Sequence, residues 1–132
     1  MPFKGSCLCG AVAYEVDAVE DPVMHCHCAT CRKAHAAAHG TVALVKPGNF
    51  RWLRGEDRLT AYESSPGKVR RFCPVCGSHV VASKEGVDAV LLRVATLDDD
   101  PGNRPAMHIW TAHDVPWLAE EGLERHREFS PK

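Results

Sequence analysis

The sequence has no long hydrophobic run and no excess of one charge. None of its apolar stretches approaches the roughly 20 residues that a membrane-spanning helix needs. Lys plus Arg number 16 and Asp plus Glu number 17, so the net charge is -1 and the whole chain offers no basic face for nucleic acid. The stretch after Lys4 also lacks the apolar segment of a secretory signal. We therefore expect a cytoplasmic protein that binds neither membranes nor nucleic acid.

Internal repeats and low-complexity segments are absent too, and the composition is that of an ordinary soluble domain. The 132 residues are 45% hydrophobic and 25% charged. This length and apolar content are enough to bury a real core. We therefore predict a single domain over residues 1–132.

Short apolar segments separated by turn residues predict a mainly β protein. The segments that we expect to be strands are 11–16, 40–45, 50–53, 58–63, 79–83, 88–97 and 106–110. The linking stretches KPGN, RGED, SSPGK and KEG are rich in turn-forming residues, which favours antiparallel connections. One alanine-rich segment, residues 29–39, predicts a short helix with Thr30 as its N-cap. Residues 114–126 predict a loosely helical or irregular end.

Cysteine is plentiful but odd in number, which argues against a closed set of disulfides. In a reducing compartment, clustered cysteines are more often metal ligands or catalytic groups. The proline and glycine of FCPVCG suit a tight turn that presents two thiolates, and the cysteines of CLC would share one face of an extended strand. Four thiolates make a closed structural zinc site. We predict such a site, called here the four-cysteine set, from Cys7, Cys9, Cys73 and Cys76.

Cys26, Cys28 and Cys31 form a second group, the three-cysteine set, with no cysteine left to complete it. The first two can share a strand face, and the third can return from the first turn of the helix, whose positive end favours thiolate. Three protein ligands and one open position are typical of a reactive zinc site. Three thiolates weaken Zn²⁺ as a generator of hydroxide but leave it able to take a further soft thiolate. The set therefore predicts a second, more labile zinc ion whose fourth ligand is a thiol substrate, ionised for attack on an electrophile.

Two other interpretations of the three-cysteine set stay open. A histidine would complete a closed structural site with three cysteines and one histidine. The candidates for that role are His25, His27, His35 and His39. An iron–sulfur cluster would need a fourth cysteine, and taking one would dismantle the other set.

The ordered motifs GSCLCGAV, HCHCATCRK, FCPVCGS, TLDDD and HIW…PW resemble the glutathione-dependent formaldehyde-activating enzyme family, which includes the centromere protein V-like domains. The resemblance runs from about Lys4 to Trp117. It implies an Mss4-like fold, with antiparallel β-sheets around a zinc site. It also implies that the four-cysteine set binds a structural zinc and the three-cysteine set a catalytic zinc. The implied activity is that of a carbon–sulfur lyase, which condenses formaldehyde with glutathione to S-hydroxymethylglutathione.

One segment departs from the pattern of the family. Where a small or Gly-containing stretch and then an aromatic are expected, the chain has AHAAAHG, which puts His35 and His39 near the three-cysteine set. Either histidine could fill the open position as a fourth ligand, act as a general base, or lie on an exposed helix face. The substrate of the family is therefore a hypothesis for this chain.

Other side chains give weaker signals. Four basic residues could steer an anionic thiol or simply be solvated: Arg32, Lys33, Arg70 and Arg71. Three large aromatics could line a pocket but are expected in the core: Trp52, Trp110 and Trp117. The run 98–100 indicates a solvated turn.

Two hypotheses of function follow. The first is a zinc-dependent enzyme that adds a glutathione-like thiol to a small aldehyde such as formaldehyde, or catalyses the reverse. The second is a non-catalytic zinc-binding module for protein interaction.

Overall fold

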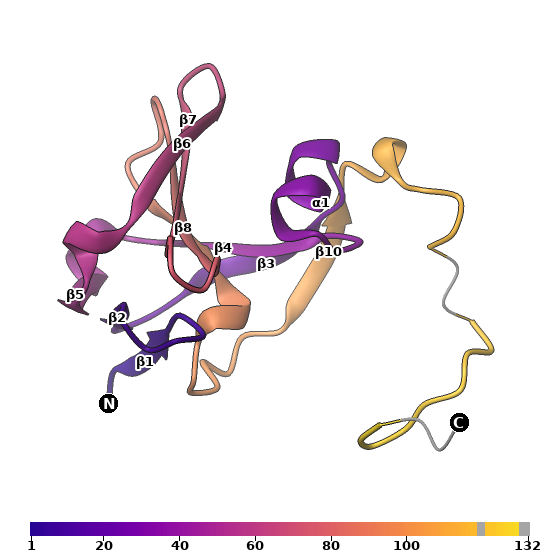
Figure 1. Ribbon diagram of the computed structural model, residues 1–132, viewed down its shortest axis with the longest axis horizontal. Helices are drawn as coiled ribbons and strands as arrows, with labels where there is room; N and C mark the ends of the chain where they lie inside the picture. The colour runs from indigo at the N-terminus through magenta and orange to yellow at the C-terminus, as the bar shows by residue number, and fades with distance from the viewer. Residues whose placement is uncertain (119–120, 130–132) are drawn as a thin grey trace.

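Two β-sheets form the body of the protein in a computed structural model that describes residues 1–118 and 121–129 (Figure 1). The smaller sheet has the strand order β1-β2-β5, and the larger has the order β10-β3-β4-β9-β8-β7-β6. The strands are β1 (Phe3–Ser6), β2 (Ala13–Val16), β3 (Glu20–Cys26), β4 (Gly40–Val45), β5 (Phe50–Arg54), β6 (Thr60–Ser65), β7 (Lys68–Phe72), β8 (His79–Lys84), β9 (Val90–Arg93) and β10 (Pro105–Ile109). The helices are α1 (Ala29–His35) and the 3-10 turns η1 (Pro47–Asn49), η2 (Glu56–Arg58), η3 (Val94–Thr96) and η4 (Thr111–His113).

Neighbouring strands are antiparallel except at one edge, where β10 runs parallel to β3. The prediction of a mainly β protein with one short α-helix after the three-cysteine set is confirmed for the described residues. The strand expected over 88–97 ends earlier, at Arg93, and η3 follows it. Strands β1, β3 and β7 lay outside the segments predicted as strands, and β3 is the one that carries Cys26.

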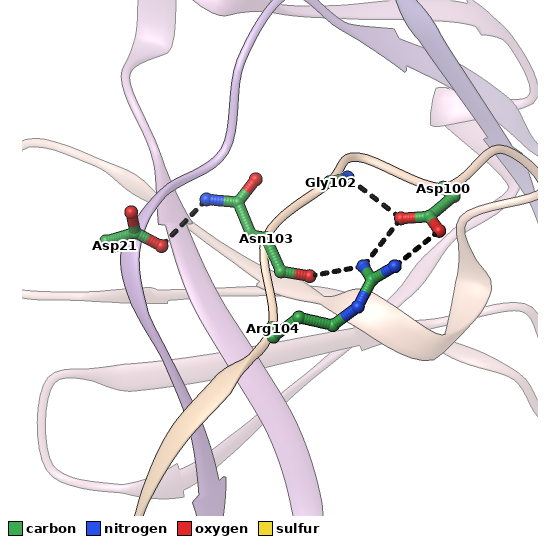
Figure 2. A network of polar contacts seen from close by, with 5 residues as sticks. All are labelled: Asp21, Asp100, Gly102, Asn103 and Arg104. Atoms are coloured by element: carbon green, nitrogen blue, oxygen red, sulfur yellow. Dashed lines mark hydrogen bonds and ion pairs between the residues drawn. The ribbon is translucent and has the colours of Figure 1, made fainter.

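A network of polar contacts fixes the loop before β10 (Figure 2). Nδ2 of Asn103 donates to Oδ1 of Asp21 at 2.8 Å and to the carbonyl of Val19 at 3.2 Å. The guanidinium of Arg104 binds both carboxylate oxygens of Asp100, at 2.8 and 2.9 Å. Exposed ion pairs of this kind add little stability. The hydrogen bonds of Asn103, by contrast, tie the loop to the start of β3, beside which β10 runs in the same direction.

The larger core lies between β2 and one face of the seven-stranded sheet. Strand residues alternate between faces, and Ala43 and Leu92 belong to this core. Its largest aromatic is Tyr14, which is fully buried, stacks on Phe50 at 5.2 Å between ring centroids and forms a hydrogen bond with Thr96 at 2.7 Å. Burial of one such side chain is worth about 2 to 3 kcal/mol.

A smaller core lies on the opposite face of the same sheet, next to α1. It contains Val42 and Leu91, the strand neighbours of Ala43 and Leu92. Two members of the three-cysteine set, Cys26 and Cys31, are buried in it. The second cysteine site is therefore built on a separate face from the main core.

The helix α1 is shorter than predicted and has a different N-cap. Its N-cap is Cys28, whose sulfur accepts the backbone N–H of Cys31 at 3.3 Å, rather than Thr30. It ends at His35 because Ala36 adopts a left-handed conformation with φ of 51°, which turns the chain toward β4. Alanine content alone could not locate this stop, since alanine favours continuation of a helix.

The C-terminal region is irregular where the structure describes it. The turn η4 is followed by residues 114–118 without regular structure, and residues 119–120 of the predicted loosely helical end lie outside the described part. Within residues 1–118 and 121–129, no helix has the length and apolar character needed to cross a bilayer.

Replacement of Gly5 by alanine tests the packing of the smaller sheet on the main core. A Cβ at Gly5 would overlap the ring of Tyr14, which is enclosed by other aromatics. Overpacking of this kind costs about 1 to 3 kcal/mol. We expect Gly5→Ala to lower the free energy of unfolding by that amount in urea titrations of zinc-loaded protein. Gly48→Ala is the control, because nothing lies within 4 Å of the added carbon. Equal stability of the two variants would contradict this account of the core.

Candidate metal centres

The four-cysteine set is brought together by two similar turns from distant parts of the chain. Its sulfur atoms all lie within 4.8 Å of one another. The sulfurs of Cys7 and Cys9 are 3.7 Å apart, and those of Cys9 and Cys73 are 3.8 Å apart. In one turn the N–H of Gly10 donates to the carbonyl of Cys7, and in the other the N–H of Gly77 donates to that of Cys73. The set could hold a tetrahedral metal ion.

Cys7 and Cys9 lie in a turn and not on the predicted extended strand. The strand β1 ends at Ser6, and Gly10 has a positive φ of 80° that closes the turn. The expected convergence of the two sulfurs is present, but a turn and not strand alternation produces it. Positive φ at Gly10 is matched by φ of 79° at Gly77, although the hydrogen bond that closes the turn spans three residues at Cys7 and four at Cys73.

Hydrogen bonds favour the thiolate form of one member of the four-cysteine set, Cys76. Hydrogen bonds from Ser78 lower the pKa of Cys76 to about 5. The backbone N–H of Val12 donates to the sulfur of Cys7 at 3.3 Å. Cys7 and Cys73 are buried in the main core, so an ion here would cross-link β1 to the connection between β7 and β8. This arrangement fits a structural role.

The three-cysteine set is assembled where β3 turns into α1 (Figure 1). Cys26 is the last residue of β3, Cys28 caps the helix and Cys31 lies in its first turn. Their sulfur atoms all lie within 4.8 Å of one another, and no histidine or carboxylate among the described residues joins them at that distance. Cys26 and Cys31 are buried, whereas Cys28 is half-buried. The donor set is soft and incomplete, which fits a metal ion with a free position.

The thiols of this set differ in acidity. Burial opposes ionisation of Cys28, but hydrogen bonds from the Thr30 hydroxyl and the Cys31 backbone outweigh it and lower the pKa of Cys28 to about 6. Burial raises the pKa of Cys26 to about 12. The predicted influence of the helix start is therefore exerted through a direct N–H···S contact at Cys28.

Arg70 is buried beside this set, although the sequence suggested a solvated or steering residue. It is 1% exposed, and its Nη2 lies 3.5 Å from the sulfur of Cys31. Its Nε donates to Ser64 at 2.9 Å. Register places it on the α1 face, since it pairs with Ala82 of the smaller core. Arg71, its neighbour, is exposed.

Arg93 is a second buried cation that sequence reasoning missed. It is 3% exposed and pairs across the sheet with Val42, which places it on the same face as Cys26 and Cys31. The sequence signal was an arginine within the continuous apolar run VLLRV of a predicted strand. A charge in such a run is rarely left buried without a functional or pairing reason.

Most of the candidate histidines lie away from the three-cysteine set. Because strand residues alternate, His25 faces away from Cys26, and it forms a hydrogen bond with Thr41 at 2.9 Å. The ring centroids of His25 and His39 are 4.2 Å apart, and those of His27 and His39 are 5.0 Å apart. These rings and His108 form one group, in which Nε2 of His27 lies 2.8 Å from Nδ1 of His108.

His35 is the histidine placed on the side of the cysteines. Its ring lies against Gly40, where an added Cβ would be 2.9 Å from Nε2 of His35 and 3.7 Å from the Cβ of Cys31. The ring is also 5.0 Å from that of His79. Neither His35 nor His39 belongs to the group of atoms within 4.8 Å of one another that the three sulfurs form.

A small cavity opens at Cys28. Its volume is about 260 Å³, and its lining includes Cys28, Lys68, Lys84 and Trp110. Burial lowers the pKa of Lys68, which is consistent with its place beside the site. Trp110 is 58% exposed, so the expectation that it belongs to the core is wrong.

The other two tryptophans differ from each other in exposure. Trp117 is 67% exposed, so it too lies outside the core, whereas Trp52 packs against the main core as expected.

The cavity at Cys28 therefore combines an exposed aromatic, Trp110, with two lysines and a thiol. Such an arrangement is suited to binding an anionic organic thiol.

Comparison with known proteins assigns the class. The family model for glutathione-dependent formaldehyde-activating enzymes matches residues 2–113, and the chain belongs to this family. A Halomonas elongata protein with the provisional name glutathione-dependent formaldehyde-activating enzyme is 27% identical over 139 residues, covering 98% of this chain and 88% of that protein. A crystal structure of a Rhodobacter sphaeroides protein matches with a TM-score of 0.65 and 25% identity, covering 80% of this chain and 97% of that one. The family resemblance inferred from the sequence is confirmed.

Metal analysis of single cysteine variants tests the two sets separately. We expect the purified protein to contain close to two zinc ions, and Cys28→Ser to contain close to one while its unfolding midpoint changes little. Cys73→Ser should also lose one ion but unfold at much lower denaturant, because removal of a structural metal removes folding free energy. A mild chelator should extract the ion of the three-cysteine set first. Simultaneous loss of both ions would contradict an open second site.

The pH dependence of stability tests the burial of His35. Burial lowers the pKa of His35 from an ordinary value of 6.5 to about 4. Between these two pKa values the imidazole of His35 binds a proton in the unfolded chain but not in the folded chain. The contribution of neutral His35 to the free energy of unfolding is therefore complete above about pH 6.5 and is lost as the pH falls toward 4. We expect His35→Gln to reduce the loss of unfolding free energy between pH 7 and 4.5 by about 1 kcal/mol, after allowance for partial exposure. His126→Gln, at an exposed site, is the control. An unchanged pH profile in His35→Gln would refute the assignment.

Proposed function

We propose that this chain is a zinc-dependent carbon–sulfur lyase, acting as one domain, that adds a glutathione-like thiol to a small aldehyde such as formaldehyde, or catalyses the reverse. The four-cysteine set would hold a structural zinc ion, and the three-cysteine set a catalytic one. The observation that carries the proposal is the incomplete three-cysteine set beside the cavity at Cys28. Membership of the family supports the choice of thiol and aldehyde.

The chemistry of the proposed step balances without a further reactant. The substrate sulfur attacks the carbonyl carbon of the aldehyde and forms a carbon–sulfur bond. The π electrons of the carbonyl move to its oxygen, and the proton given up by the thiol ends on that oxygen as a hydroxyl group. A zinc ion held by the three-cysteine set would supply a soft Lewis acid that keeps the substrate sulfur ionised at neutral pH.

The residues around the cavity bind and orient the substrate in this proposal. Lys68 and Lys84 face each other across β7 and β8 and would attract the carboxylates of an anionic thiol. Trp110 would cover the apolar part of the same molecule. On the other side Arg70 donates to the sulfur of Cys31 and holds the ligand set in place.

The alternative of a non-catalytic interaction module has one observation in its favour. Leu8 and Val75, the middle residues of the turns of the four-cysteine set, are 86% and 72% exposed. Apolar side chains at the tips of a rigid zinc site suit contact with a protein partner. The test below separates this alternative from the enzyme.

Exchange measurements with formaldehyde and glutathione test the enzyme directly. We expect the wild-type protein to accelerate the interconversion seen by NMR exchange spectroscopy above the rate without protein, which is itself appreciable. Cys28→Ser should abolish the acceleration. Lys68→Met with Lys84→Met should raise KM about three- to tenfold and leave kcat nearly unchanged, since the lysines act in attraction and binding.

Lys46→Met provides the control, because Lys46 is an exposed lysine paired with Glu20 away from the cavity. Its KM should equal that of the wild type. Absence of acceleration by a wild-type protein that contains both zinc ions would reject the enzyme and leave the interaction module.

A further inference from the structure

Arg93 carries a buried positive charge, and two of its three guanidinium nitrogens have no hydrogen-bond partner within the described chain. The side chain is 3% exposed, and both Nε and Nη2 are buried without a hydrogen-bond partner among residues 1–118 and 121–129. Arg70 differs in degree, since only its Nη1 lacks a partner while its Nε and Nη2 donate to Ser64, Thr30 and Cys31. A buried charge is costly unless it is paired and hydrogen-bonded. The unused N–H groups of Arg93 therefore point to a ligand.

Three imidazoles, those of His35, His39 and His79, share the cavity that Arg93 lines. The cavity has a volume of about 350 Å³, and its lining includes Arg93, His35 and His79. Nε2 of His35 and Nδ1 of His79 are both buried without a hydrogen-bond partner in the described part of the chain. Burial lowers the pKa of both rings, so each is neutral at pH 7 and can present one N–H to the cavity.

The lining has donors but no acidic side chain. Residues around this cavity include neither Asp nor Glu, so a cation would find no charged ligand there. Nε and Nη2 of an arginine form a planar fork that matches the two oxygens of a carboxylate. We propose that this cavity is a carboxylate-binding site, in which Arg93 binds both oxygens and His35 and His79 donate further hydrogen bonds.

The position of the cavity relates the site to the three-cysteine set. Ala34 and His79 also line a larger cavity of about 510 Å³ that includes Thr30 and Arg70. Nη2 of Arg70 reaches the sulfur of Cys31 at 3.5 Å. The occupant could thus be a carboxylate of the thiol substrate, an assignment that rests on the proposed function, or a separate small carboxylate. Both sources present the same chemistry to Arg93.

Binding of acetate to the zinc-loaded protein tests the site without any catalytic readout. At constant ionic strength we expect acetate to raise the Tm saturably, by about 10 °C at 100 times its Kd. Acetamide, which has nearly the same shape but no charge, should have no such effect. Arg93→Met should abolish the acetate shift. Arg71→Met, on the same sheet but exposed, should keep it. The proposal is overturned if wild type shows no saturable shift, or if Arg93→Met responds like wild type.

A second variant and a second measurement cover the case in which Arg93→Met does not fold. Arg93→Lys keeps the charge but loses the fork, and we expect it to bind acetate at least about tenfold more weakly. In NMR spectra of the wild-type protein, acetate should shift the imidazole resonances of His35 and His79 and leave those of His126 in place. Acetate binding that leaves the rings of His35 and His79 unperturbed would place the anion elsewhere and reject the site.

Two thiols distinguish the sources of the carboxylate. The ratio of kcat/KM for 3-mercaptopropionate to that for 2-mercaptoethanol should fall about tenfold in Arg93→Lys if the substrate supplies the carboxylate. An unchanged ratio with weakened acetate binding assigns the site to a separate small carboxylate. If acetate binds but the protein has no thiol–aldehyde activity, the carboxylate-binding site stands and the proposed enzyme function is rejected. If the protein is active but does not bind acetate, the enzyme function stands and the carboxylate-binding site is rejected.

Discussion

The alternation of side chains between the two faces of the sheet at the end of β3 is the constraint on which the three-cysteine set depends. Successive residues of a strand point to opposite faces, so the sequence HCHC divides its cysteines from its histidines. Cys26 enters the smaller core with Cys31, whereas His25 and His27 join His39 and His108 on the other side. The result is a purely thiol donor set on one face. A shift of one residue in the register of β3 would exchange the two groups and destroy the set.

The chain completes this set only because β3 passes into α1 within two residues. Cys28 has an extended conformation, with φ of -59° and ψ of 152°, and its sulfur occupies the place of a capping oxygen. The N–H of Cys31 that would need a cap is thereby satisfied, and the same contact favours the thiolate. Cys28 therefore both caps the helix and supplies a candidate metal ligand. The predicted N-cap, Thr30, has another role, because its hydroxyl is hydrogen-bonded to the sulfur of Cys28 at 3.2 Å.

Spacing of cysteines in the sequence was enough to predict both sets, and short apolar segments between turn residues were enough to predict the mainly β class, because metal ligation and turn chemistry leave local patterns. The turn at Cys7 and Cys9 was mistaken for a strand because Cys-x-Cys brings sulfurs together in either conformation. The stop of α1 at Ala36 was missed, since a left-handed alanine has no sequence signal. Arg93 was missed for a different reason. Its burial depends on β4 and β8 lying beside β9, and such pairing is a tertiary property that a single strand does not reveal.

The buried arginines alter the electrostatic argument that the cysteines alone suggest. Three thiolates with one Zn²⁺ would carry a single net negative charge, but Arg70 and Arg93 are buried on the same face and bring two positive charges close to the sulfurs. Burial lowers the pKa of Arg93, and the nearby thiolates oppose that effect, so thiolates and guanidinium groups stabilise one another.

In the proposed enzyme, the same cations would affect a substrate sulfur that joins the set. They favour its ionised form, yet a sulfur of lower pKa is also a weaker nucleophile, and the best attacking thiol has a pKa near the ambient pH. Arg70 donates to only one of the three sulfurs, at a long 3.5 Å. This contact is with a ligand sulfur of the protein, so it does not itself weaken the nucleophilicity of an incoming substrate sulfur.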